Sequence, residues 1–174
     1  MSNAGNEHFD QELPTSFPVA VIMQCRESAG QWQDYEWQAL GVVVGGLHVA
    51  ANNSDAMLLR KDDGVEQFVY GGLEAMLYVD ECESYYHNLL AKTPRCYVIA
   101  RRDEDAVPVP FLVSLSFDEA HAYLEADDEV FEVDMPPEIY RWTEAFVLHH
   151  YTPEKRVKRK RQNWRGEAGN GGGV

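Results

Sequence analysis

The fold is decided by residues 95–123, which read RCYVIARRDEDAVPVPFLVSLSFDEAHAY. Within this stretch, residues 96–100 and 107–115 are rich in Val, Ile, Tyr and Phe, the residue types that favour β-strands. The charged residues 101–105 between them are too polar to bury, and a polar turn between two apolar runs is typical of a β-hairpin. We therefore predict a central hairpin of two antiparallel strands.

A helix is predicted directly after this hairpin. Ser116 lies three residues before Glu119, the spacing at which a hydroxyl and a carboxylate can each bind a free backbone N–H at a helix start. The predicted helix covers residues 117–126. Helical periodicity gives it one expected inward face, which contains Phe117, Ala120, His121 and Leu124.

More strands are predicted on the N-terminal side of the hairpin. Residues 18–26 form an apolar run, and residues 35–44 begin with alternating apolar and polar side chains, as in a half-buried antiparallel strand. Residues 57–60 and 67–70 are predicted to pair around Asp62–Asp63–Gly64, because these residue types tolerate left-handed turn positions. The strands come in runs and do not alternate with helices, which favours a mostly antiparallel sheet.

The chain is predicted to break at Gly71–Gly72. Residues 73–79 then fit either a strand or the first turn of a helix. We favour a strand, because Asp80 and the acidic residue three positions later resemble a helix start. The helix that follows should stop before Pro94, and its expected inward residues are Cys82, Tyr85, Tyr86 and Leu89.

The C-terminal part of the domain is predicted to hold a short strand and a last helix. Residues 130–133 fit an edge strand. Residues 134–138, DMPPE, place proline and acidic side chains at a helix N-terminus, where both are favourable. The helix should end near Thr152–Pro153, and its expected apolar stripe contains Ile139, Trp142, Phe146 and Val147.

These elements predict an α+β fold. The mostly antiparallel sheet should be strongly bent or form a partly open barrel, with two to three helices, one of them C-terminal. We expect a flexible lead-in at residues 1–16, a single α+β domain at residues 17–153 and a disordered basic tail at residues 154–174. No apolar run approaches the roughly 20 residues that span a bilayer, and the polar N-terminus is unlike a secretion signal, so we expect a cytoplasmic protein.

Charge is distributed unevenly along the chain. The formal net charge is −14, but residues 1–153 carry 8 Lys and Arg against 27 Asp and Glu, whereas residues 154–174 carry 7 against 2. An acidic body repels nucleic acids and anionic membranes, while the tail could contact either of them or an acidic protein surface. The tail residues that we predict to bind a partner are Lys155, Arg156, Lys158, Arg159, Lys160, Arg161, Trp164 and Arg165.

We predict no catalytic residue, no metal site and no cofactor, and the sequence leaves cofactor-binding residues unknown. Three cysteines without a C-x-x-C pair indicate buried free thiols. Residues 41–46, GVVVGG, lack the spacing of a phosphate-binding loop. His149 and His150 would point about 100° apart on a helix, so they cannot both bind one metal ion. Ser114 and Ser116 are explained as strand and cap residues, and residue chemistry alone therefore identifies no function.

A family resemblance is carried by VIMQCRES, WQDYEWQALGVV, ESYYHNL with PRCYVIARR, VPVPFLVSLSFDEAHAYL, and MPPEIYRWTEAFVLHHY leading into KRKR. From about Val19 to Arg161, the chain resembles a small bacterial family of unknown function that is encoded near molybdenum-dependent formate dehydrogenases and their maturation genes. The resemblance implies a non-enzymatic accessory or adaptor protein in the assembly or regulation of a molybdoenzyme. It implies a protein client, such as a molybdoenzyme subunit or a maturation factor.

Two other functions stay open at this point. A nucleic-acid-associated regulator would use the basic residues of segment 155–165, and its binding would depend steeply on salt. A protein that handles a small molecule would need a deep pocket lined by some of the nine tyrosines.

Overall fold

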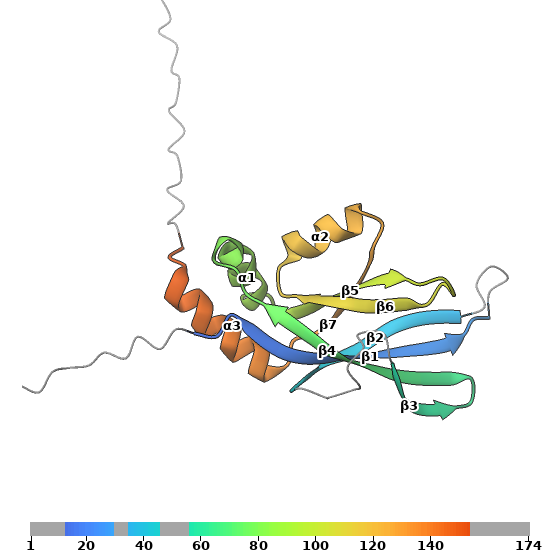
Figure 1. The fold of residues 1–174 in the computed structure, drawn as a ribbon. Coiled ribbons are helices and arrows are strands. Elements are labelled where there is room, and N and C mark those ends of the chain that lie inside the picture. The colour runs from blue at the N-terminus through green and yellow to red at the C-terminus, as the bar shows by residue number, and fades with distance from the viewer. Residues whose placement is uncertain (1–12, 30–34, 46–55, 154–174) are drawn as a thin grey trace, which may run out of the picture.

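Seven strands and three α-helices form the part of the chain that the computed structural model describes, residues 13–29, 35–45 and 56–153. The strands make one sheet with the order β2-β1-β4-β6-β5-β7, and β3 pairs with β4 beside this path. The two end strands, β2 and β7, lie next to each other, so the sheet is a nearly closed barrel with one seam (Figure 1). This confirms the predicted α+β class with a mostly antiparallel sheet.

The first half of the barrel is built around β1 (Ser16–Glu27). β1 pairs antiparallel with β2 (Tyr35–Val44) on one side and with β4 (Val65–Met76) on the other. β3 (Met57–Asp62) pairs antiparallel with the first part of β4 through a two-residue turn, Asp63–Gly64. The strands predicted at residues 18–26 and 35–44 and the hairpin after them are confirmed.

The second half contains the predicted central hairpin. β5 (Arg95–Arg102) pairs antiparallel with β6 (Pro108–Ser114) and with β7 (Glu129–Asp134). The two halves join where β4 runs parallel to β6, at the pair Ala75 and Val113. The only parallel contact among the described strands is therefore a short one, at the place where the two antiparallel halves meet.

The predicted break at Gly71–Gly72 is wrong. β4 continues through both glycines to Met76, and its register against β1 shifts between Val19 and Val21. Gly72 has φ +72°, a conformation that glycine adopts without the steric cost of a Cβ atom. The glycines form a β-bulge that bends the strand.

Two of the three helices lie at one end of the barrel (Figure 1). A 3₁₀ turn (Val79–Glu81) leads into α1 (Cys82–Leu89), and α3 (Pro137–His150) lies against α1. In the described part of the chain, no helix has both the length and the apolar composition needed to cross a membrane. The predicted stripe of α3 is confirmed, because Ile139, Trp142, Phe146 and Val147 are all buried in the core.

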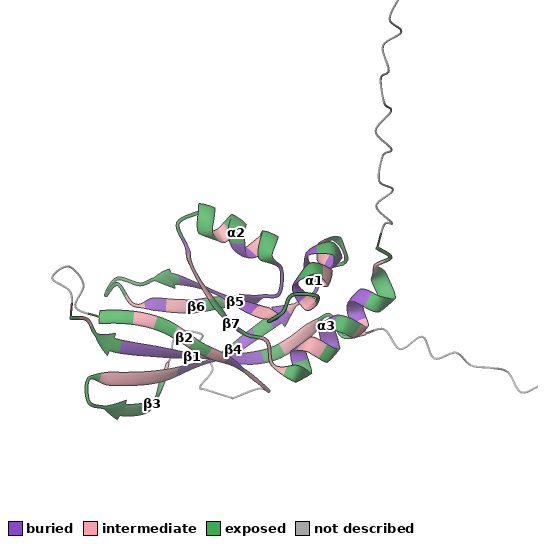
Figure 2. Cartoon of the chain, turned by 180° about the vertical axis from the view of Figure 1, so that it is seen from behind, coloured by how far each residue is buried: buried purple, intermediate pink, exposed green. Residues whose placement is uncertain are grey.

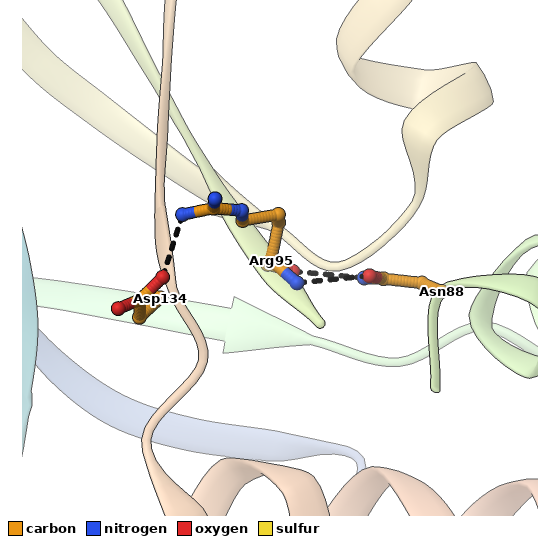
Figure 3. Close-up of polar contacts among 3 residues, drawn as sticks. All are labelled: Asn88, Arg95 and Asp134. Atoms are coloured by element: carbon orange, nitrogen blue, oxygen red, sulfur yellow. Dashed lines mark hydrogen bonds and ion pairs between the residues drawn. The ribbon is translucent and has the colours of Figure 1, made fainter. Parts of the chain in front are cut away.

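Hydrogen bonds from Asn88 fix α1 to the sheet. Its side-chain amide donates to the backbone oxygens of Arg95 and Leu115, both at 2.8 Å, and its carbonyl oxygen accepts from the Arg95 N–H at 2.9 Å. The Arg95 side chain extends the other way and pairs with Asp134 of β7 at 2.6 Å (Figure 3). Cys25, Cys82 and Cys96 are buried free thiols, as predicted.

The inward face predicted for α2 (Phe117–Glu125) is wrong for most of its residues. Ala120 is buried, but Phe117 is 53% exposed, Leu124 is 54% exposed and His121 is exposed as well. α2 lies over β5, β6 and β7 on the outside of the barrel, and most of its surface faces outward (Figures 1 and 2). Apolar periodicity predicted the helix correctly, but which of its side chains are buried depends on the elements that pack against it.

Candidate binding cleft at the open end of the barrel

The turns between β3 and β4 and between β5 and β6 lie at the end of the barrel away from α1 and α3 (Figure 1). β4 pairs with β3 over residues 65–69 but meets β6 only near Ala75, so β3 and β6 diverge between these points. A cleft of about 580 Å³ lies at this opening. Its lining comes from β1, β2, β4, the last residue of β5, residue Ala56 and the turn between β5 and β6.

The floor of the cleft is aromatic. Cys25 pairs with Trp37 on one neighbouring strand and with Glu66 on the other, so these three side chains share the inner face of the barrel. The rings of Trp37 and Phe68 lie 5.9 Å apart, and Tyr70 is buried deeper in the barrel. Such a floor offers a large apolar contact area to a bound group.

The turn between β5 and β6 forms one rim of the cleft and is held by its own hydrogen bonds. One Asp103 carboxylate oxygen accepts from the N–H groups of Asp105 and Val107, at 3.0 and 2.9 Å. Arg102 donates to the Ala106 carbonyl oxygen at 2.6 Å and also forms an ion pair with Glu129. Aspartate is favoured in turns because its side chain can bind nearby backbone N–H groups, and here Asp103 fixes the shape of the rim.

Charges of both signs surround the aromatic floor. Glu66, Asp105 and Arg102 line the cleft. Glu66 forms an ion pair with Lys61 of β3 at 2.5 Å, and the Lys61 side chain is exposed. The cleft therefore combines an apolar floor with a few polar groups at its edge, as binding sites in proteins commonly do.

The titratable groups of the cleft floor are held in their neutral forms. Burial raises the pKa of the Cys25 thiol, and the carboxylate of Glu66 raises it further. Burial also raises the pKa of Tyr70, with smaller contributions from Asp103 and Cys25. Both groups are therefore protonated at neutral pH, and a protonated thiol is a poor nucleophile.

The structure does not test the binding site predicted in the tail, and the sequence did not predict the cleft. The tail residues Lys155, Arg156, Lys158, Arg159, Lys160, Arg161, Trp164 and Arg165 lie outside the described residues, so their predicted role stays a prediction. The cleft was not located from the sequence. In the sequence, Tyr35 and Trp37 alternate with polar residues, which places two aromatic side chains of the cleft on one face of a strand. The point where β3 and β6 diverge depends on strand pairing, which the sequence alone does not give.

The side chains that most often bind metal ions do not identify a function for the described residues. In residues 13–29, 35–45 and 56–153, no three His, Cys, Asp or Glu side chains gather in a metal-binding arrangement.

Comparison with curated proteins and with solved structures gave no match. A family model does match residues 18–161, from β1 to beyond α3. Since this match covers most of the chain, the protein belongs to the family described as "Protein of unknown function (DUF3305)".

Proposed function

We propose that this chain is a non-enzymatic accessory protein that binds a protein client. The observation that supports this function best is the cleft at the open end of the barrel, with its aromatic floor, its mixed charges and its protonated Cys25 and Tyr70. Aromatic side chains in concave, partly desolvated sites contribute most of the binding energy in many protein interfaces.

The strand beside the cleft suggests how a client is held. Among the described strands, β3 pairs only with β4. Its consecutive residues Met57, Leu58 and Leu59 are 44%, 50% and 47% exposed, and β3 is exposed along its length (Figure 2). An exposed apolar edge strand is able to pair with an extended segment of another chain.

The opposite side of the opening is less able to pair. β6 meets β4 only near its C-terminal end, and the rest of that edge includes Pro108 and Pro110. Proline has no N–H to donate to a neighbouring strand. We therefore expect the client segment to align with β3. Leu58 pairs with Phe68, so a client side chain beside Leu58 could enter the cleft.

The family resemblance suggests the identity of the client. We place the chain in the cytoplasm, in the assembly or regulation of a molybdoenzyme such as formate dehydrogenase, where the client is an enzyme subunit or a maturation factor. The basic residues of segment 155–165 would add contacts to acidic groups of that client.

The test is affinity capture with the full chain as bait in extracts of its native host, followed by mass spectrometry. Leu58→Arg should abolish capture of the client, because it places a charge beside the apolar floor. Leu148→Arg is the matched control, since Leu148 is 78% exposed on α3, far from the cleft. Equal capture by both variants would contradict the proposal.

Two alternatives give different results in the same assay. The cleft volume of about 580 Å³ also suits a small molecule, which native mass spectrometry of the protein purified from its host would detect as an added mass. A nucleic-acid regulator would instead lose its partner when duplex DNA is added in excess, and its binding would fall steeply with salt.

A further inference from the structure

A second exposed apolar surface lies on the other side of the molecule from β3, around α2 (Figure 1). Phe117 is 53% exposed and lines two hollows. One hollow, of about 300 Å³, is also lined by His87 and Asp118. The other, of about 180 Å³, is lined by Tyr97, Leu124 and Glu132. We call Phe117 and these two hollows the Phe117 surface.

The Phe117 ring is held in place although it is exposed. Its centroid lies 6.1 Å from that of Tyr97 in an edge-on arrangement and 5.8 Å from that of His121. The residue before it, Ser116, caps α2 and is fully buried, which fixes the point where the helix starts. A ring held by its neighbours loses little freedom when it binds, and a preorganised group therefore binds more tightly.

The charge around this surface is negative. Asp118 lines one hollow and Glu132 the other, and no Lys or Arg is among the described residues that line either of them. Arg95 lies close to Tyr97 in the sheet, but its side chain is paired with Asp134 at 2.6 Å (Figure 3). An anionic partner such as a nucleic acid or a membrane surface would be repelled here.

We infer that the Phe117 surface docks a basic segment of a protein partner that carries a large apolar side chain. The apolar side chain contacts Phe117 and Leu124, and Lys or Arg residues beside it pair with Asp118 and Glu132. The inference rests on the proposed function and adds to it. With one surface at β3 and a second at α2, the chain can hold two segments at once, as an adaptor must.

A binding assay with a defined probe tests this inference on the full chain. The probe is a fluorescein-labelled Lys/Arg-rich peptide with one central Trp, and its Kd is measured by fluorescence anisotropy at physiological ionic strength. Phe117→Ser and Leu124→Ser should each weaken binding at least about tenfold, as loss of an aromatic or apolar anchor does. Glu132→Gln should weaken it about two- to fivefold, since an exposed ion pair contributes little.

Matched controls come from α3. Leu148→Ser and Glu144→Gln change an exposed apolar and an exposed acidic residue outside the surface, and both should leave the Kd unchanged. Unchanged melting temperatures for all variants would exclude misfolding. A probe with Gly in place of Trp should bind weakly and should not respond to Phe117→Ser. Equal effects of Phe117→Ser and Leu148→Ser would overturn the inference.

Other results separate the possible occupants and the two proposals. If replacing the basic residues of segment 155–165 by Ser tightened probe binding tenfold, the occupant would be this chain's own tail, which overturns an external partner. If client capture is lost in Leu58→Arg but the probe Kd of Phe117→Ser equals that of the natural chain, only this inference is contradicted. Probe binding with the expected variant pattern, without any captured client, would support this inference and contradict the proposed function.

Discussion

Glu81 accepts a 2.5 Å hydrogen bond from the Ser116 hydroxyl, and this contact joins the start of α1 to the N-cap of α2. The same hydroxyl oxygen accepts from the Glu119 N–H at 3.1 Å and lies 3.0 Å from the Ser84 hydroxyl. The Glu119 carboxylate does not complete the predicted capping box. It accepts from the Ser114 hydroxyl at 2.5 Å, and Ser114 in turn accepts from the Ser116 N–H.

Replacing Ser116 by Ala should therefore lower the free energy of unfolding by about 1–2 kcal/mol, because the helix loses its cap and Glu81 loses a buried donor. Urea denaturation monitored by circular dichroism measures the change in the free energy of unfolding. The exposed Thr93→Ala is the control and should change stability by less than about 0.5 kcal/mol. A loss no greater than the control's would show that the network is not needed for stability.

Gly64→Ala should destabilise the protein by about 1–2 kcal/mol, the cost of a left-handed conformation for a residue with a Cβ atom. Gly64 has φ +76° after Asp63 at +42°, and an added Cβ would meet Glu27 only at 3.6 Å, so strain and not a clash sets the cost. Gly41→Ala is the matched control, because its Cβ would meet nothing within 4 Å. It should be neutral or slightly stabilising. Similar losses at both glycines would contradict this account.

Features set by neighbouring residues could be predicted from the sequence. The Asp63–Gly64 turn follows from residue types that accept positive φ, and the buried stripe of α3 follows from the spacing of Ile139, Trp142 and Phe146. The Ser116 cap depends on a residue only three positions away. Each of these predictions needed no knowledge of how distant segments pack.

Features set by distant residues could not be predicted in this way. Gly71–Gly72 looks like a chain break in sequence, but pairing with β1 keeps both glycines in one strand. Leu124 has the spacing of a buried residue, yet α2 lies on the outside of the barrel, and Leu124 is 54% exposed. The cleft depends on where β3 and β6 diverge, and this is decided by pairing across the whole sheet.

The acid stability of the protein should depend on Asp128. Its carboxylate is only 4% exposed and accepts two hydrogen bonds from Arg101, both at 2.7 Å. These bonds hold the pKa of Asp128 below its usual value. A carboxyl group whose pKa is lower in the folded state contributes stability above its unfolded pKa, about 3.9, and that stability is lost as the pH falls through the folded pKa.

Asp128→Asn should therefore flatten the fall of the melting temperature below about pH 4, in addition to lowering the melting temperature at neutral pH. Arg101→Met should flatten it in the same way, because it removes the group that lowers the pKa of Asp128. Thermal unfolding measured across this pH range gives the two slopes. If the melting temperature falls as steeply below about pH 4 in Asp128→Asn as in the natural chain, another carboxyl group is responsible for the acid sensitivity.

The last prediction concerns the segment before β1. The Trp142 indole N–H donates to the Pro14 carbonyl oxygen at 2.6 Å, and the Trp142 ring packs 5.1 Å from Phe17 and is 8% exposed. With the other three tryptophans replaced by Phe, Trp142 should show blue-shifted emission and weak quenching by iodide. Deleting residues 1–14 should shift this emission to the red, because water replaces the Pro14 carbonyl.

The same deletion allows the contact to be measured as a coupling energy. Trp142→Phe should cost about 1 kcal/mol more in the full chain than in the shortened chain, because only the full chain has the Pro14 carbonyl to lose. The loss of ring volume is the same in both chains and cancels in the comparison. Equal costs, together with an emission spectrum that the deletion leaves unchanged, would show that the segment before β1 makes no contact with α3 in solution.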